Sequence, residues 1–415
     1  MNTRPRIIFH VDVNSAFLSW ESAWREEQKN KQALPAEDID LRTIASAIGG
    51  DQKSRHGIIL AKSTKAKEYG ITTGEPLVSA LKKCPNLVIV PPNFKIYTQY
   101  SAQLMKLLSD YTPSIFQFSI DEAFLDMTET CHLFGDPIKV ANDIRERIYK
   151  ELHFTVNVGI STNKLLAKMA SDFKKPNLCH TLFPDEIETK MWPLPVDELF
   201  FVGRSALKKC NMLGIHTIGD LAKMNPAILK AHFGAKYAEL ILHYANGIDD
   251  DPVVPDEGPN KGYGNSVTLK RDVTDFETAS QVLLAISETV GSRLRMAGVK
   301  CNCITVELKN ADFITKSHQV TLSDSTNTTN VIYEASCHLL KEIWTYEPLR
   351  LLGIRTSKLD DNDFTQMSLF DNPKNEKQKK LDMAIDSIRE KFGDNSIKRA
   401  SFLSDNTICP HKVGK

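Results

Sequence analysis

Two apolar runs of this chain stop abruptly at carboxylates. Asp12 closes the run at 7–11, and the adjacent Asp121 and Glu122 break a second run at 119–125. Burying such charges is costly unless a cation neutralises them. Mg²⁺ does so with a few carboxylates, water and substrate phosphates, and three carboxylates can hold two ions for an in-line phosphoryl displacement. A helix cap and a solvated turn would produce the same residues, so the carboxylates alone leave both interpretations open.

The residues that flank these carboxylates favour the metal site. Residues 10–17 read HVDVNSAF, residues 119–126 read SIDEAFLD, and residues 158–172 read VGISTNKLLAKMASD. In this order the three stretches resemble motifs of the Y-family, or translesion, DNA polymerases, and the match is closest to the bacterial DNA polymerase IV branch. The resemblance extends over residues 1–250 and, more loosely, over residues 251–350.

The resemblance implies an α+β fold with the right-hand architecture of polymerases. The strands and helices expected between residues 6 and 160 are mixed as in an antiparallel sheet backed by helices, which is typical of a polymerase palm. The expected domains are a palm at 1–20 and 78–172, small fingers at 21–77, a helical thumb at 173–249, a linker at 250–261, an α+β little finger at 262–357 and a flexible tail at 358–415.

Two glycines in the expected thumb flank a short helix. Gly203 precedes this helix and Gly214 follows it, which resembles helix–hairpin–helix units, whose amides and helix N-termini suit a DNA phosphate. Ordinary helix packing gives the same spacing. The position of both glycines behind a polymerase palm favours DNA binding.

The resemblance also assigns the carboxylates. Asp12, Asp121 and Glu122 are the expected catalytic residues and hold two Mg²⁺ ions, with the backbone carbonyl of Val13 as a further ligand. Asp126 is also acidic, and we interpret it as structural. Asn14 is uncharged where many relatives carry a second aspartate, so it does not belong to the expected metal ligands.

Four residues are expected to bind the incoming nucleotide. Phe17 takes the place of the aromatic steric gate that excludes a 2′-hydroxyl, although a core position on the first helix would explain it equally without the motif. Lys164 matches a lysine directed at the triphosphate, whereas Lys168 faces DNA or solvent. Many relatives place a tyrosine and an arginine against the triphosphate where this chain has Thr64 and Lys67, which predicts weaker nucleotide binding.

A short peptide in the polar tail resembles the segment by which bacterial polymerases bind the sliding clamp. It reads QMSLF and includes Gln366, Leu369 and Phe370. An apolar pair is otherwise hard to explain in a polar tail. Five-residue matches also arise by chance, and the place of this one after the last polymerase domain favours clamp binding.

Composition restricts the function only weakly. Lys plus Arg equal Asp plus Glu at 52 each, so DNA binding requires local clustering of basic residues. The eight cysteines show no paired zinc-site spacing, and Cys301 and Cys303 fit alternate positions of a buried strand. We find no signal-peptide pattern and no apolar run near the ~20 residues of a membrane span, so we expect a monomeric cytoplasmic protein.

The sequence therefore predicts a template-directed DNA polymerase that adds dNTPs to a primer 3′-hydroxyl. The resemblance further implies an open active site, low fidelity and synthesis opposite damaged bases. Two alternatives compete with this prediction. A nucleotidyl cyclase also has a palm-like sheet and two metals, but needs neither the glycine hairpins nor a clamp peptide. A clamp-tethered DNA-binding protein that no longer polymerises would explain Thr64 and Lys67.

Overall fold

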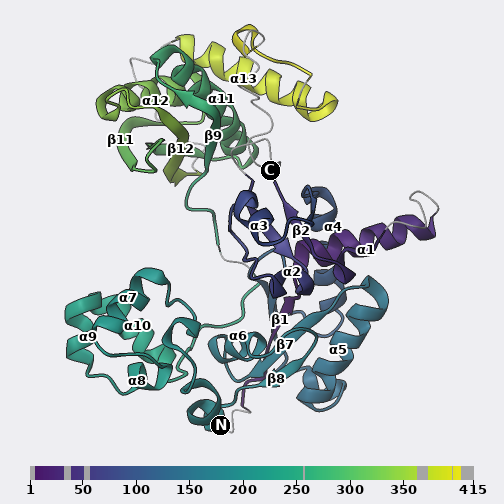
Figure 1. The fold of residues 1–415 in the computed structure, drawn as a ribbon. Helices are drawn as coiled ribbons and strands as arrows, with labels where there is room; N and C mark the ends of the chain where they lie inside the picture. The colour runs from purple at the N-terminus through teal and green to yellow at the C-terminus, as the bar shows by residue number, and fades with distance from the viewer. Residues whose placement is uncertain are drawn as a thin grey trace. The chain divides into compact units, whose positions relative to one another are not determined.

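The computed structural model describes residues 5–31, 39–50, 57–255, 258–361, 373–394 and 396–402. These residues form two compact units, one built from the chain before residue 256 and one from the chain after residue 257. Figure 1 labels many of the helices and strands of both units. None of the described helices is both long and apolar enough to cross a membrane.

The first unit contains a five-stranded sheet that carries the predicted carboxylates. Its order is β5-β6-β1-β7-β8, and all neighbours are antiparallel except the parallel pair β7–β8. The strands are β1 (Ile8–Val13), β5 (Ile115–Gln117), β6 (Glu122–Asp126), β7 (Val156–Ser161) and β8 (Cys179–Thr181). All six residues of β1 are buried, because this strand lies in the middle of the sheet and is covered on both faces.

Alternate residues of β1 face different layers. Phe9, Val11 and Val13 belong to a core that includes residues of three helices, α1 (Ala16–Asn30), α4 (Phe94–Leu108) and α5 (Pro137–Leu152). Ile8 belongs to a separate cluster with Ala167 of helix α6, which spans Lys164–Asp172. Because strand side chains alternate, His10 and Asp12 point to the same face as Ile8, under α6.

Helix α6 contacts the sheet directly at Gly159 of β7. A Cβ atom at Gly159 would lie 1.9 Å from the carbonyl oxygen of Ala167 in α6, so only glycine permits this approach. His10 is the neighbour of Gly159 in the adjacent strand. The close approach therefore brings the side chains of α6 within reach of the end of β1.

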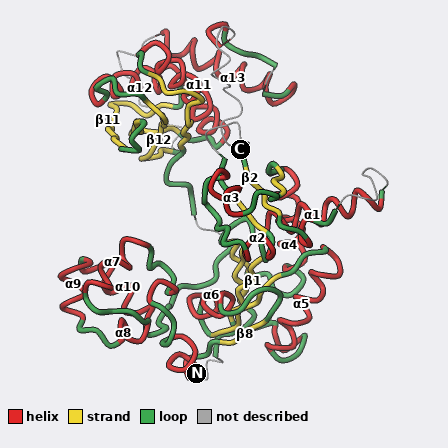
Figure 2. The backbone as a smooth tube through the Cα atoms, viewed as in Figure 1, coloured by secondary structure: helices red, strands yellow, loops and turns green. Residues whose placement is uncertain are grey.

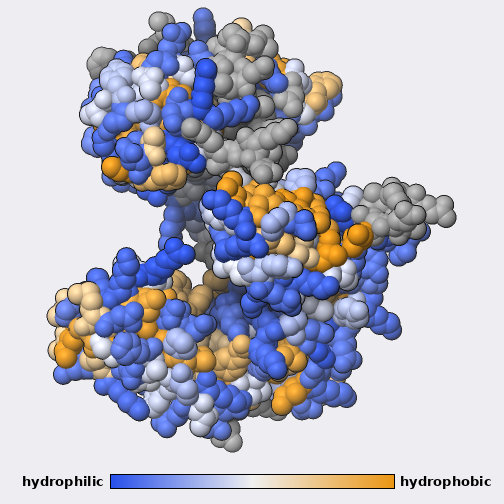
Figure 3. All heavy atoms as spheres, viewed as in Figure 1, coloured by the Kyte–Doolittle hydropathy of each residue, from blue (hydrophilic) through white to orange (hydrophobic). Residues whose placement is uncertain are grey.

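A second, three-stranded sheet follows α1 along the chain. Its order is β3-β2-β4, with strands β2 (Ser46–Gly49), β3 (Ile59–Lys62) and β4 (Val88–Val90). Two short helices accompany it, α2 (Thr64–Glu68) and α3 (Leu77–Lys83), and a 3₁₀ turn, Leu41–Thr43, precedes β2. Figure 3 shows hydrophobic residues on the surface around α3, where Val78 and Val88 are exposed. Strand β2 pairs with both of the other strands, antiparallel to β3 and parallel to β4.

Short helices form the last part of the first unit. They are α7 (Arg204–Met212), α8 (Ile218–Ala222), α9 (Pro226–Phe233) and α10 (Ala235–Ala245), after shorter helical turns at Pro184–Glu186, Ile187–Met191 and Val196–Glu198. Their core also contains Leu165 and Leu166 of α6. Helix α6 therefore connects this helical layer to the five-stranded sheet.

The second unit is a four-stranded antiparallel sheet with two long helices on it, as Figure 2 shows. The order is β11-β10-β12-β9, with strands β9 (Gly264–Val273), β10 (Lys300–Asn310), β11 (Thr315–Thr326) and β12 (Leu349–Asp360). The helices are α11 (Phe276–Met296) and α12 (Thr329–Ile343). Cys301 and Cys303 are buried in β10, as predicted.

A further helix, α13 (Pro373–Phe392), and a 3₁₀ turn, Ala400–Phe402, follow in the second unit. Arg295 of α11 binds Asp382 at 3.3 Å and Asp386 at 2.6 Å, and Glu288 of α11 accepts from Arg389 at 3.0 Å. Residues 373–392 of the expected tail therefore form a helix in this structure. Its charged residues pair with charges on α11.

Candidate active site

The three predicted carboxylates lie at one edge of the five-stranded sheet. Asp12 near the end of β1 is the register partner of Glu122 at the start of β6. The amide of Val13 donates a hydrogen bond to the carbonyl of Asp121 at 3.1 Å, which holds the turn before β6 against the end of β1. Segments more than a hundred residues apart in the sequence thus place three carboxylates beside one another.

Asp12 is almost fully buried and forms an ion pair with Lys175, whose ammonium group contacts Oδ2. Burial raises the pKa of the Asp12 carboxyl to about 7, and the nearby Lys175 charge opposes this rise. Burial alone would lower the pKa of Lys175, but attraction to Asp12 outweighs it and the pKa is raised. Lys175 therefore carries the positive charge that a buried carboxylate at this position requires.

Glu122 has a different cationic partner. The ammonium of Lys168 donates to Oε1 of Glu122 at 2.9 Å, and Lys168 is only 8% exposed. Burial would raise the pKa of Glu122, but the neighbouring His10 ring and the Lys168 charge hold it well below its usual range. Glu122 is therefore ionised, and the expectation that Lys168 faces DNA or solvent is wrong.

His10 lies beneath Glu122 and is completely buried. Nδ1 of the His10 ring shares a hydrogen bond with Ser171 Oγ at 2.7 Å, and Ser171 Oγ also lies 2.8 Å from the carbonyl oxygen of Lys168. Nε2 lies 3.6 Å from Oε2 of Glu122. Burial lowers the pKa of His10 to about 4, so the ring is neutral at physiological pH.

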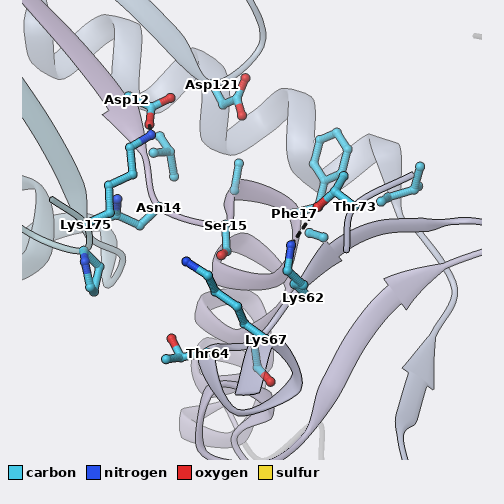
Figure 4. A pocket seen from close by; sticks show the side chains of 16 residues that line it. Asp12, Asn14, Ser15, Phe17, Lys62, Thr64, Lys67, Thr73, Asp121 and Lys175 are labelled. Atoms are coloured by element: carbon cyan, nitrogen blue, oxygen red, sulfur yellow. Dashed lines mark hydrogen bonds and ion pairs between the residues drawn. The ribbon is translucent and has the colours of Figure 1, made fainter. Parts of the chain in front are cut away.

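Asp121 and Asp12 open onto a cavity of about 390 Å³. Asp121 is partly exposed, and Ser119 Oγ donates to its Oδ1 at 2.6 Å. In Figure 4 the two aspartates lie at one end of the cavity and Thr64 and Lys67 of α2 at the other. The cavity is lined by Asp12, Val13, Asn14, Ser15, Ala16, Phe17, Leu60, Ala61, Lys62, Ser63, Thr64, Lys67, Thr73, Asp121, Lys175 and Pro176. A volume edged by carboxylates and by lysines can take a polyanion together with cations.

Phe17 lines this cavity and is also part of an aromatic cluster. Its ring stacks on Tyr97 with centroids 4.8 Å apart and meets the ring of Phe94 edge-on at 5.9 Å. The side chain is partly buried. The two interpretations of Phe17 from the sequence are therefore compatible, since packing on Tyr97 orients a ring that also borders the cavity.

Comparisons with known proteins identify the family. Residues 11–172 match the model of the impB/mucB/samB family, residues 260–369 match the C-terminal domain of that family, and residues 197–249 match a DNA polymerase-iota thumb domain. The chain is 47% identical over 398 residues to a DNA polymerase IV of Clostridium acetobutylicum, covering 96% of this chain and 98% of that protein. It is 35% identical over 409 residues to DNA polymerase IV 2 of Bacillus subtilis, with coverage of 97% and 95%.

The chain belongs to the Y family of DNA polymerases. A solved Y-family polymerase chimera has the same fold, with a TM-score of 0.74 and 23% identity over 86% of this chain and all of the chimera. The predicted family and the α+β right-hand fold are thus confirmed.

The sequence led us to expect Lys164 at the nucleotide site of this Y-family chain, but the structure places Lys175 there. Lys164 does not line the cavity; its ammonium lies 3.7 Å from Asp251 and 5.4 Å from the centroid of Phe116. Lys175 lines the cavity and was missed by the sequence analysis. The signal was the basic pair Lys174-Lys175, which follows the third motif directly after Phe173.

Two further polar residues near the site have structural partners. Asn14 donates to Oδ1 of Asn157 at 3.1 Å and accepts from the amide of Asn177 at 2.9 Å. Asp126 accepts from the amide of Thr128 at 3.0 Å. Both side chains therefore help to hold the backbone around the site.

The donor atoms at the sheet edge are of the chemical type that binds a hard divalent cation. Carboxylates and a backbone carbonyl are the oxygen ligands that Mg²⁺ prefers. In the part of the chain that the structure describes, no three His, Cys, Asp or Glu side chains lie close enough to hold a metal together. Asp12 and Glu122 instead each direct an oxygen at a lysine ammonium, so both carboxylates already bind a cation.

The two glycines expected in the thumb, Gly203 and Gly214, have different backbone roles. Gly203 is the N-cap of α7, and a Cβ there would meet no atom within 4 Å. Gly214 has φ +72°, a left-handed conformation that favours glycine, in the turn between α7 and α8.

The peptide with Gln366, Leu369 and Phe370, for which the sequence predicts clamp binding, lies outside the described residues.

Proposed function

We propose that this DNA-directed DNA polymerase joins dNTPs to a primer 3′-hydroxyl with two Mg²⁺ ions held by Asp12, Asp121, Glu122 and the carbonyl of Val13. The observation that supports the proposal is the position of these residues at one edge of the sheet, beside a cavity bordered by Phe17. When bound, such ions would promote ionisation of the attacking hydroxyl and neutralise charge on the leaving pyrophosphate.

The residues of the chain then have separate tasks. Asp12 and Asp121, which border the cavity, supply the negative charge that attracts the cations. Lys168 keeps Glu122 ionised and oriented, because it binds one of its two oxygens from a buried position. Phe17 excludes a 2′-hydroxyl by occupying the space beneath the sugar, and Tyr97 prevents the ring from turning away.

Basic and hydroxyl side chains bind the triphosphate in this proposal. Lys175, Lys67 and Thr64 border the cavity, and Lys62 lies next to them with its ammonium 3.2 Å from Thr73 Oγ1. Burial lowers the pKa of Lys62, and the Lys67 charge lowers it further. Two lysines that repel each other across a cavity are stabilised when a polyanion binds between them. We assign triphosphate binding to Lys175 in place of Lys164.

The remaining parts follow the Y-family domains. The five-stranded sheet forms the palm, the three-stranded sheet with α2 and α3 the fingers, α7–α10 the thumb and β9–β12 with α11 and α12 the little finger. The backbone around Gly203 and Gly214 would bind a DNA phosphate, because the first turn of a helix presents free amides. Gln366, Leu369 and Phe370 would bind the sliding clamp, and synthesis would continue past damaged bases.

Primer extension tests the proposal. The full chain is incubated with a primed template, dNTPs and Mg²⁺, and the products are compared with those formed in excess EDTA and on a template with one abasic site. We expect Mg²⁺-dependent extension on both templates. Formation of a cyclic nucleotide, or DNA binding without extension, would contradict the proposal.

A further inference from the structure

Asp172, the last residue of α6, binds both lysines that neutralise the palm carboxylates. Its Oδ2 lies 3.3 Å from the ammonium of Lys168 and its Oδ1 lies 2.8 Å from that of Lys175. Each lysine therefore contacts Asp172 on one side and a catalytic carboxylate on the other. The five charges form one connected network of two cations and three anions.

Lys168 and Lys175 differ in how easily each can release its carboxylate partner. The side chain of Lys168 is 10% exposed, whereas that of Lys175 is 37% exposed and borders the cavity. Asp172 is itself 42% exposed. Lys175 can therefore exchange one partner for solvent or ligand at little cost, while Lys168 is held by the surrounding helix and sheet.

We infer that Lys175 is the resident counter-ion of Asp12, which a divalent cation replaces, and that Asp172 is a positioning residue that retains Lys175 beside the cavity after this exchange. The inference rests on the metal site of the proposed function. It assigns a role to Asp172, which is neither a metal ligand nor a cavity-lining residue.

The physical reason is the cost of leaving Asp12 without a partner. Asp12 is 5% exposed, and a carboxylate buried to this degree needs a cation whenever it is ionised. Direct exchange of ammonium for metal avoids a state with an unpaired charge. Asp172 then offers Lys175 a second carboxylate, so that the ammonium does not remain against the metal and repel it.

Mn²⁺ binding to the full chain without DNA tests the inference, with free Mn²⁺ measured by its electron paramagnetic resonance signal. Lys175→Gln removes the competing ammonium, and we therefore expect Mn²⁺ to bind about fivefold more tightly. This factor corresponds to the upper end of the free energies found for partly exposed ion pairs. Asp172→Asn leaves both lysines on the catalytic carboxylates, and we expect binding weaker by about the same factor. Lys175→Arg keeps the charge and should stay within about twofold of the natural chain.

The double variant distinguishes a connected network from separate effects. If Asp172 acts through Lys175, the loss caused by Asp172→Asn shrinks in the Lys175→Gln background. Additive effects of the two changes would overturn the role of Asp172. Unchanged or weaker Mn²⁺ binding by Lys175→Gln would overturn the role of Lys175.

Matched controls keep these outcomes interpretable. Asp143→Asn removes an exposed acid from α5 and should leave Mn²⁺ binding unchanged. Asp12→Asn combined with Lys175→Gln should abolish the gain, because the gain arises at Asp12. Urea unfolding establishes that each variant folds. If one of the Asp172 and Lys175 variants does not fold, Mn²⁺ binding by the other still tests the role of its own residue. If the natural chain extends primers while Lys175→Gln gains nothing, this inference fails and the proposed function stands.

Discussion

The ammonium of Lys168, in helix α6, lies 2.9 Å from Oε1 of Glu122, the first residue of β6. Neither side chain has access to much water, since their exposed fractions are 10% and 18%. Each charge is stable at this depth because the other is present. The pair therefore links the packing of α6 on the five-stranded sheet to the orientation of Glu122.

Lys168→Met should destabilise the protein by about 2–3 kcal/mol, because removal of one partner leaves a largely buried carboxylate uncompensated. Urea unfolding of the first unit measures this change. Lys150→Met, on the exposed side of α5, is the matched control and should cost less than about 0.5 kcal/mol. A Lys168→Met protein as stable as the control would mean that Glu122 finds another partner.

Asp121→Asn should abolish nucleotide addition while DNA binding stays within about threefold, because the carboxylate serves cations and not the fold. Single-turnover primer extension and fluorescence anisotropy with primed DNA measure the two properties. Asp126→Asn is the matched control and should extend primers normally, since an amide oxygen can still accept from Thr128. Near-normal extension by Asp121→Asn would remove this residue from the metal site.

Phe17→Ala should admit ribonucleotides, because loss of the ring opens space beneath the sugar. We expect the preference for dNTP over rNTP to fall by about tenfold or more, which corresponds to about 1.4 kcal/mol of discrimination. The ratio of kcat/KM values on one template is the measurement. Phe134→Ala, a partly exposed ring that packs on Tyr111, controls for loss of an aromatic residue. An unchanged ratio would make Phe17 a core residue only.

Thr64→Tyr combined with Lys67→Arg should lower the KM for the incoming nucleotide. Both side chains border the cavity, and a phenol with a bidentate guanidinium would add phosphate contacts of about 1.5–3 kcal/mol each at best. Steady-state kinetics with one dNTP measures the change. Lys65→Arg, on the same short helix but not lining the cavity, is the control. A higher KM in the double variant would show that this segment binds the triphosphate differently.

Deletion of Gln366 to Phe370 should leave synthesis on a short primed template intact and remove stimulation by the sliding clamp. A five-residue peptide binds weakly alone, because its ordering costs entropy, and tethering through DNA raises its effective concentration. The stimulation factor with and without clamp is the readout. A same-length Gly/Ser replacement controls for the spacing between β12 and α13. Equal clamp stimulation of the deleted and the intact chain would show that the peptide match is accidental.

The sequence alone determined the family and the α+β class, and it singled out three carboxylates that the structure places at one edge of the sheet. Each of these depends on a contiguous motif, since Asp12 lies in residues 10–17 and Asp121 and Glu122 in residues 119–126.

Only the tertiary structure decided which cation each carboxylate holds. Lys175 is 163 residues from Asp12 and meets it because α6 lies directly on Gly159, an approach that depends on one missing side chain. Strand β2 depends on two partner strands, and α13 depends on charges that α11 presents to it. Such contacts are formed between distant segments, so the local sequence does not show which residues meet. Packing therefore placed Lys175 at the cavity and Lys164 elsewhere.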